Sequence, residues 1–133
     1  MIFKKVTEGI YRGSQPETKA DYQKVLLLPV KTIMKLNEDR EEEEWKFCTS
    51  NGIPMGGYPL SEWGRPSTTL LLENVEMVRN FPKPIFVHCL HGYERTGRVI
   101  AEYRIKVQGW SKWEAIKEAL REGFSPLMLW WFL

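Results

Sequence analysis

The chain has 133 residues, of which 43% are hydrophobic and 13% aromatic, and its formal net charge is +2. This composition is typical of one compact globular domain and excludes a disordered chain, while the near balance of charge gives no indication of nucleic-acid binding. Two cysteines are too few for a disulfide framework and favour a reducing compartment. The sequence shows neither a signal peptide nor an apolar run near the ~20 residues of a membrane span, so we expect a cytoplasmic protein.

The first part of the chain predicts two strands, a loop and a helix. Residues 3–12 read as two short extended segments around a turn. The glycine and proline within residues 12–16 predict a loop. Thr18 and Asp21 have the spacing of a capping box, which predicts a helix that ends near Leu27.

A strand and a second helix follow. Residues 31–36 predict the strand, and residues 40–50 predict the helix. Glu41–Glu44 in its first turn suit the positive end of the helix dipole and are expected to be solvated. Trp45 and Cys48 fall on one face, and Cys48 is expected to be a small buried hydrophobe.

The next segment predicts a short strand, a long loop and a third helix. The strand covers residues 53–55, and the loop covers residues 56–66. Ser67 is placed to cap a helix that runs to Asn80, with an inward apolar stripe that includes Leu72.

The stretch 85–98 reads I-F-V-H-C-L-H-G-Y-E-R-T-G-R. A β-prone apolar run leads into Cys89, and a helix-periodic segment starts at Thr96. A strand, a short loop and a helix in this order form an anion cradle, because loop N–H groups and the helix N-terminus point at one spot. In that positive field the Cys89 thiol can ionise at neutral pH, and Arg95 offers two donors that match a phosphoryl group. Gly92 lets the backbone turn without a Cβ that would block the anion.

Two further elements are predicted after the helix over 96–108. Ser111 opens a capping box for a helix whose inward face includes Trp113, and Gly123 ends it. The apolar tail 126–133 is expected to pack on the sheet, with a dimer surface as the alternative.

The alternation of strands and helices predicts a single α/β domain over residues 1–133, with a mostly parallel sheet covered by helices on both faces. The carboxyl ends of such strands are where ligands bind, and Cys89 lies there.

The motif H-C-x-x-G-x-x-R-T-G, from His88 to Gly97, resembles the signature loop of the cysteine-dependent protein tyrosine and dual-specificity phosphatases, in particular the small atypical dual-specificity type. The resemblance implies that Cys89 is the nucleophile, that Arg95 binds phosphate and that the Thr96 hydroxyl assists the thiolate as leaving group. His88 is expected to orient the loop and stabilise the thiolate. The implied phosphate-binding residues follow the cysteine: Leu90, His91, Gly92, Tyr93, Glu94 and Arg95.

The family also needs a carboxylic acid, commonly an aspartate on a mobile loop before the signature. Glu62 stands where that aspartate falls, in the order acid, aromatic, glycine, any residue and proline, although the preceding Trp-Pro is absent. A solvated loop glutamate is the alternative explanation. Glu94 is the rival, because phosphoinositide phosphatases resembling myotubularins carry an aspartate there. Asp39 comes third, since helix capping explains it.

These residues predict hydrolysis of phosphotyrosine, with phosphoserine and phosphothreonine as further substrates, in a phosphorylated protein or peptide. Inositol phosphate or phosphoinositide hydrolysis is the alternative, which the lack of lysine in the loop disfavours. A pseudophosphatase that binds phosphate without turnover and a rhodanese-type sulfurtransferase are two others.

No cofactor and no metal are predicted. His88, Cys89 and His91 as zinc ligands would lack a fourth partner and would leave Arg95 unexplained. A disulfide between Cys48 and Cys89 stays open as a minor alternative.

Overall fold

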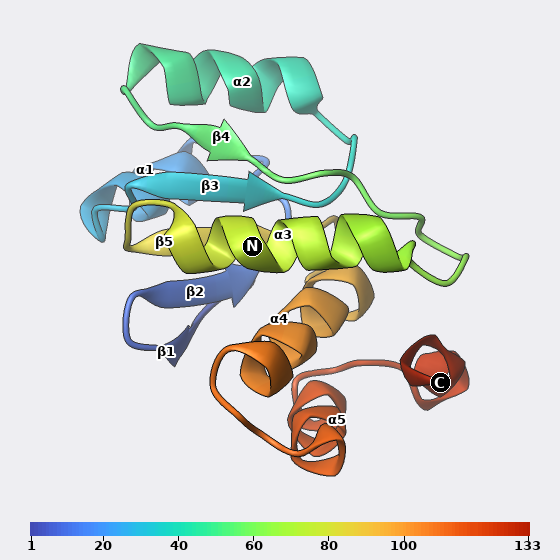
Figure 1. The fold of residues 1–133 in the computed structure, drawn as a ribbon. Coiled ribbons are helices and arrows are strands. Elements are labelled where there is room, and N and C mark those ends of the chain that lie inside the picture. Colours follow the sequence, from blue (N-terminus) through green and yellow to red (C-terminus); the bar gives the residue numbers. More distant parts are fainter.

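The computed structural model describes residues 1–133 and shows one five-stranded sheet with helices on both faces (Figure 1). The spatial strand order is β1-β2-β5-β3-β4, and only the β1–β2 pair is antiparallel. This confirms the predicted α/β fold with a mostly parallel sheet. The strands are β1 (Phe3–Thr7), β2 (Ile10–Gly13), β3 (Thr32–Lys35), β4 (Met55–Gly56) and β5 (Ile85–His88).

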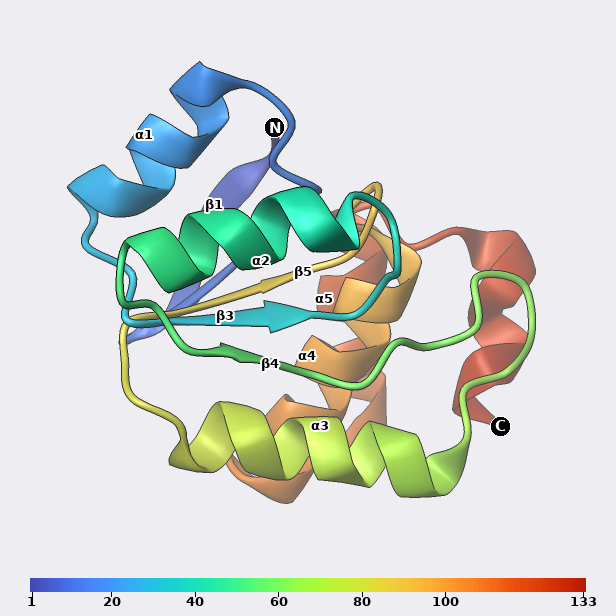
Figure 2. The same ribbon diagram turned by 90° about the horizontal axis from the view of Figure 1, so that it is seen from above.

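The helices form two layers around this sheet. They are α1 (Lys19–Leu27), α2 (Glu41–Ser50), α3 (Thr68–Asn80), α4 (Glu94–Lys106), α5 (Lys112–Arg121) and the 3₁₀ helix η1 (Pro126–Phe132). The edge-on view in Figure 2 shows α1 and α2 on one face and α3 and α4 on the other.

Side-chain caps begin three of the α-helices, as the sequence predicts. The Thr18 hydroxyl accepts a hydrogen bond from the Asp21 N–H at 3.1 Å, and Ser111 forms the same kind of capping box with Glu114. The Ser67 hydroxyl caps α3. Each cap of this kind stabilises its helix by about 1 kcal/mol, because it satisfies an N–H that the helix leaves unpaired.

The side chains of β5 alternate between the two faces of the sheet. Ile85 and Val87 join the apolar cluster under α3 and α4, whereas Phe86 joins Cys48 in the cluster under α1 and α2. Cys89 belongs to the α3–α4 cluster, so the sheet separates the two cysteines. Both are free thiols, and burial raises the pKa of Cys48 to about 12. The alternative of a disulfide between them is wrong.

Three apolar side chains that the pattern places inward are exposed. They are Trp45 (56% exposed), Leu72 (39%) and Trp113 (71%). Each lies at the margin of the stripe that its helix buries. On α2, for example, the stripe runs through Glu44 and Cys48, one position before Trp45 and three after it. A packed stripe covers only about 100° of a helix, so neighbours of a buried residue are readily left outside.

The prediction that the apolar tail packs on the sheet is also wrong. η1 rests on α4 and α5, where Trp131 and Phe132 are buried against Phe124. α4 already covers this part of the sheet, so the tail forms a further layer. Arg98 of α4 anchors it, with its guanidinium 4.6 Å from the centre of the Phe132 ring. A dimer through the tail stays a prediction. No helix of the chain has both the length and the apolar character to cross a membrane.

Candidate active site

Cys89 directly follows β5 at the carboxyl edge of the sheet and opens the loop that leads into α4. Its side chain is 2% exposed, and the Gly92 N–H donates a hydrogen bond to Sγ at 3.3 Å. α4 begins at Glu94, two residues before the predicted start, and has no side-chain cap. The N–H groups of its first turn are therefore free to bind an anion beside the thiol.

The β2–α1 loop braces the signature loop from behind. Gly92 has a φ of +86°, and a Cβ there would lie 2.9 Å from the backbone of Gly13, so this position requires glycine. The Arg12 guanidinium donates to the Gly92 carbonyl at 3.1 Å, and the Gln15 N–H donates to the Leu90 carbonyl at 3.2 Å. Residues 12–16 thus lie next to the site.

Arg95 lies where two adjoining cavities meet. It is 7% exposed and forms no salt bridge, so its guanidinium is free to bind a ligand oxygen. The first cavity, of about 270 Å³, is lined by Cys89 and Arg95 together with Glu62, Trp63, His91, Glu94, Ser125, Leu127 and Met128. The second, of about 510 Å³, is lined by Arg95 together with Glu38, Asp39, Pro59, Leu60, Ser61 and Glu62.

Both glutamates considered as the acid reach the cavity of Cys89. Glu94 comes from the first turn of α4, and Glu62 comes from the loop between β4 and α3. The root of that loop is held by a hydrogen bond of 3.0 Å from the Leu60 N–H to the Leu36 carbonyl. Its tip, with Trp63 76% exposed, has few contacts of this kind, so it is free to move over a ligand.

Asp39 is also at the site, although it does not cap α2 as expected. The N-cap position is Arg40, which makes no side-chain cap. The Asp39 carboxylate instead accepts a hydrogen bond of 2.9 Å from the Asn37 amide. That bond, with a smaller contribution from the charge of Arg95, lowers the pKa of Asp39. Asp39 lines only the second cavity, whereas both glutamates line the cavity of Cys89, so Asp39 stays behind them.

The other predicted site residues divide into those that line the cavity and those that support it. Thr96 is fully buried, and its hydroxyl has no hydrogen-bond partner in the protein. The side chains of Leu90 and Tyr93 do not line the cavity, so these residues offer only backbone groups there. Tyr93 packs against Gly123, where a Cβ would lie 2.5 Å from its ring.

His88 points to the α2 face of the sheet, away from the cavity, and joins a buried polar cluster. Its Nε2 lies 2.5 Å from the Glu44 carboxylate. Glu44 is 0% exposed, so the expectation that all of Glu41–Glu44 is solvated is wrong for this residue. The reason is that Glu44 falls on the inward stripe of α2, where Lys35 forms a salt bridge of 3.0 Å with it. One signal in the sequence is Lys35 itself, because a lysine inside a covered strand needs an acidic partner.

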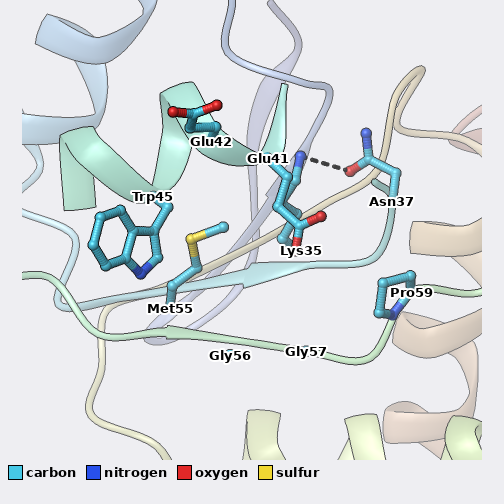
Figure 3. Close-up of a pocket in the computed structure, with 9 residues that line it drawn as sticks. All are labelled: Lys35, Asn37, Glu41, Glu42, Trp45, Met55, Gly56, Gly57 and Pro59. Carbon is cyan, nitrogen blue, oxygen red and sulfur yellow. Dashed lines mark hydrogen bonds between the residues drawn. The ribbon is translucent and has the colours of Figure 1, made fainter. Parts of the chain in front are cut away.

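The outer edge of this cluster opens into a groove of about 490 Å³ between α2 and β4 (Figure 3). Lys35 donates to the Asn37 side chain at 3.3 Å on its floor. Glu41, Glu42 and Trp45 lie on the α2 side. No group of three or more His, Cys, Asp or Glu side chains is arranged to hold a metal ion.

Comparison with known proteins agrees with this geometry. A family described as the tyrosine phosphatase family matches residues 1–124. The chain belongs to this family. Over 132 residues it is 29% identical to the dual specificity protein phosphatase TpbA of Pseudomonas aeruginosa, covering 91% of this chain and 54% of that protein. Over 124 residues it is 30% identical to the inositol diphosphatase DSP3 of Arabidopsis thaliana, covering 87% of this chain and 59% of that protein. The chain thus spans about half the length of the curated relatives it matches.

Solved structures of other phosphatases share the fold. The core catalytic domain of the PP-IP phosphatase SIW14 from S. cerevisiae, in complex with citrate, superposes with a TM-score of 0.81 at 31% identity, covering 92% of this chain and 76% of that chain. The structure of P. aeruginosa TpbA gives a TM-score of 0.76 at 25% identity, covering 92% and 80%. The predicted family and fold class are confirmed.

Proposed function

We propose that this protein is a phosphatase that hydrolyses phosphate monoesters through a phosphocysteine on Cys89. One observation carries the proposal: the Cys89 thiol, which accepts a hydrogen bond from the Gly92 N–H, lines one cavity together with an Arg95 that forms no salt bridge. The thiolate attacks phosphorus as the bond to the leaving oxygen breaks, while Arg95 and the loop amides bind the equatorial oxygens. Water then attacks the phosphocysteine, inorganic phosphate leaves and the thiolate is restored.

Both steps need a proton transfer. In this proposal Glu62 protonates the leaving oxygen and then, as a carboxylate, accepts a proton from the attacking water. Glu94 lines the same cavity and is the rival for both roles. In this proposal the Thr96 hydroxyl, which has no hydrogen-bond partner in the protein, donates to the thiolate as it leaves, and His88 supports the loop from the α2 face.

The cavity favours a single phosphate on an aromatic group, as in a phosphotyrosine of a protein or peptide. Trp63, Leu127 and Met128 supply apolar wall, and Arg95 is the only Lys or Arg in the lining. The adjoining cavity that shares Arg95 carries Glu38 and Asp39. Carboxylates around a phosphate site repel a substrate with many phosphates, so we rank inositol phosphates below a phosphorylated protein. Among phosphorylated residues, phosphoserine and phosphothreonine come after phosphotyrosine.

Inositol phosphates are the second candidate, because DSP3 is named an inositol diphosphatase and SIW14 a PP-IP phosphatase. Initial rates on a phosphotyrosine peptide, a phosphoserine peptide and an inositol pyrophosphate decide between them. We expect kcat/KM to be at least about tenfold higher for the phosphotyrosine peptide, a difference of about 1.4 kcal/mol in transition-state binding. The reverse order would move the assignment to inositol phosphates. Tight binding of vanadate without turnover of any substrate would indicate a pseudophosphatase.

We also propose that the protein works in a reducing compartment, which is the cytoplasm expected from the sequence. Cys48 and Cys89 are both free thiols, and a thiolate nucleophile works only while it is reduced.

A further inference from the structure

Apart from His88, which supports the loop, the buried polar cluster beneath the signature loop has no role in the steps above. At its centre is Glu44, whose Oε2 lies 2.5 Å from His88 Nε2. Its Oε1 accepts hydrogen bonds from Lys35 Nζ at 3.0 Å and from Gln15 Nε2 at 2.6 Å. Lys35 and His88 are register partners in the parallel β3–β5 pair, so their side chains leave the sheet together toward α2.

The partners of His88 determine where its protons are. Nδ1 lies 3.2 Å from the carbonyl oxygen of Cys89, and a carbonyl oxygen only accepts, so a hydrogen bond there requires a proton on Nδ1. An ionised carboxylate also only accepts, so the contact with Glu44 requires a second proton, on Nε2. A ring with both protons is an imidazolium.

Glu44 is ionised in this arrangement. Burial alone would raise its pKa, but the hydrogen bond and charge of His88, followed by Lys35 and Gln15, outweigh it and lower the pKa below 4.5. On α1, burial raises the pKa of Tyr22, so that phenol stays neutral. The ionised groups of the cluster are then the Glu44 carboxylate, the Lys35 ammonium and the His88 imidazolium, and the ionised Asp39, whose backbone carbonyl accepts from Lys35, lies at its edge.

We propose that Glu44 is a positioning residue of the reaction, which fixes the ring of His88 and retains a second proton on it. The buried His88 cation then contacts the Cys89 backbone from the α2 side, with Nδ1 3.2 Å from the carbonyl oxygen, and its positive charge favours the ionised form of the thiol. Glu44 lines neither cavity and acts only through His88. The inference rests on the proposed function, but its tests do not require turnover.

The first test reads the protonation of His88 in the unmodified chain. The chain has two histidines, so comparison of the ¹⁵N-labelled protein with a His91→Asn variant assigns the ring signals. Near pH 7 we expect both ring nitrogens of His88 to carry directly bonded protons. A neutral ring with one protonated nitrogen would overturn the proposal.

The second test measures the reactivity of Cys89 toward iodoacetamide, by mass spectrometry of the peptide that contains it. Near pH 6, Glu44→Gln should slow alkylation about tenfold or more, which corresponds to one pH unit in the ionisation of the thiol. The matched control is Glu43→Gln on the same helix, whose carboxylate pairs only with the exposed Arg40, and it should change the rate by less than about twofold. Glu44→Asp keeps the charge and should restore part of the reactivity.

An unchanged alkylation rate in a folded Glu44→Gln protein would overturn the proposal. If that variant does not fold, the protonation of His88 in the unmodified chain still decides the question. If His88 is an imidazolium and Cys89 is reactive but no phosphate ester is hydrolysed, the proposed function fails and the inference about the thiolate stands.

Discussion

Glu62 and Glu94 approach the Cys89 cavity from two separate elements, the loop before α3 and the first turn of α4. Only the loss of the acid that protonates the leaving oxygen should slow a substrate with a basic leaving group more than one with an activated leaving group. Glu62→Gln should therefore lower kcat roughly a hundredfold on phosphotyrosine, whose phenol has a pKa of about 10. The loss of rate should be much smaller on an activated aryl phosphate, because its leaving oxygen departs without a proton.

The matched control for this prediction is Glu94→Gln, measured on the same two substrates. It should slow both to a similar extent, if at all. If Glu94→Gln shows the dependence on the leaving group and Glu62→Gln does not, the acid belongs to the signature loop, and the substrate assignment moves toward phosphoinositides.

Substitution of Arg95 should have a different kinetic effect, because its role depends on the geometry of the guanidinium. Arg95→Lys keeps the positive charge but loses the planar pair of donors, so we expect kcat/KM to fall by about a hundredfold or more. Steady-state kinetics on a phosphotyrosine peptide measures this. Unchanged kcat and KM would show that Arg95 does not bind the transferred phosphoryl group.

The sequence predicts those site residues that lie close together along the chain. Cys89 and Gly92 lie in one short loop and Arg95 lies in the first turn of the helix after it, so the strand and the helix that flank the loop suffice to place them. Glu44 and Arg12 could not be predicted in this way. Glu44 meets His88 across 44 positions and Arg12 meets Gly92 across 80, so their roles depend on strand order and on the packing of α2.

At the scale of elements, η1 forms one wall of the catalytic cavity. Leu127 is 87% exposed and lines the cavity opposite the tip of the Glu62 loop, while Trp131 and Phe132 anchor the element. Leu127→Ala should raise KM for a phosphotyrosine peptide by about threefold to tenfold and leave kcat and the melting temperature nearly unchanged, because it removes only ground-state contact. An unchanged KM would mean that the aromatic group binds elsewhere.

Helix starts were predicted more reliably than helix faces, for a physical reason. A cap such as Ser111 acts within its own turn, so its sequence signal is complete. Which face is buried depends on what packs against the helix. The sequence does not show that η1 covers α4 and α5, or that Trp113 points outward.

At the scale of the whole molecule, the cluster around Glu44 joins α2, β3 and β5, so it should also set the acid stability. Removing one partner of a buried ion pair costs about 3–5 kcal/mol, and we expect this loss of unfolding free energy for Glu44→Gln near pH 7. The pKa of Glu44 is lowered in the folded state, so its contribution is present above pH 4.5 and is lost as the pH falls through the folded value.

Urea unfolding at neutral and at acidic pH measures this dependence. The deficit of Glu44→Gln against the unmodified chain should shrink as the pH falls below about 4. A deficit of the same size at both pH values would mean that packing, and not charge, accounts for the loss.

The most direct test of the central claim is to trap the phosphoenzyme. The protein is mixed with a phosphotyrosine peptide, quenched with acid within the first turnover and examined by mass spectrometry. We predict one added phosphoryl group on the peptide that contains Cys89, and none in Cys89→Ser, which should still bind vanadate within about tenfold of the unmodified affinity. Turnover of the peptide by Cys89→Ser at more than about one per cent of the unmodified rate would contradict the account.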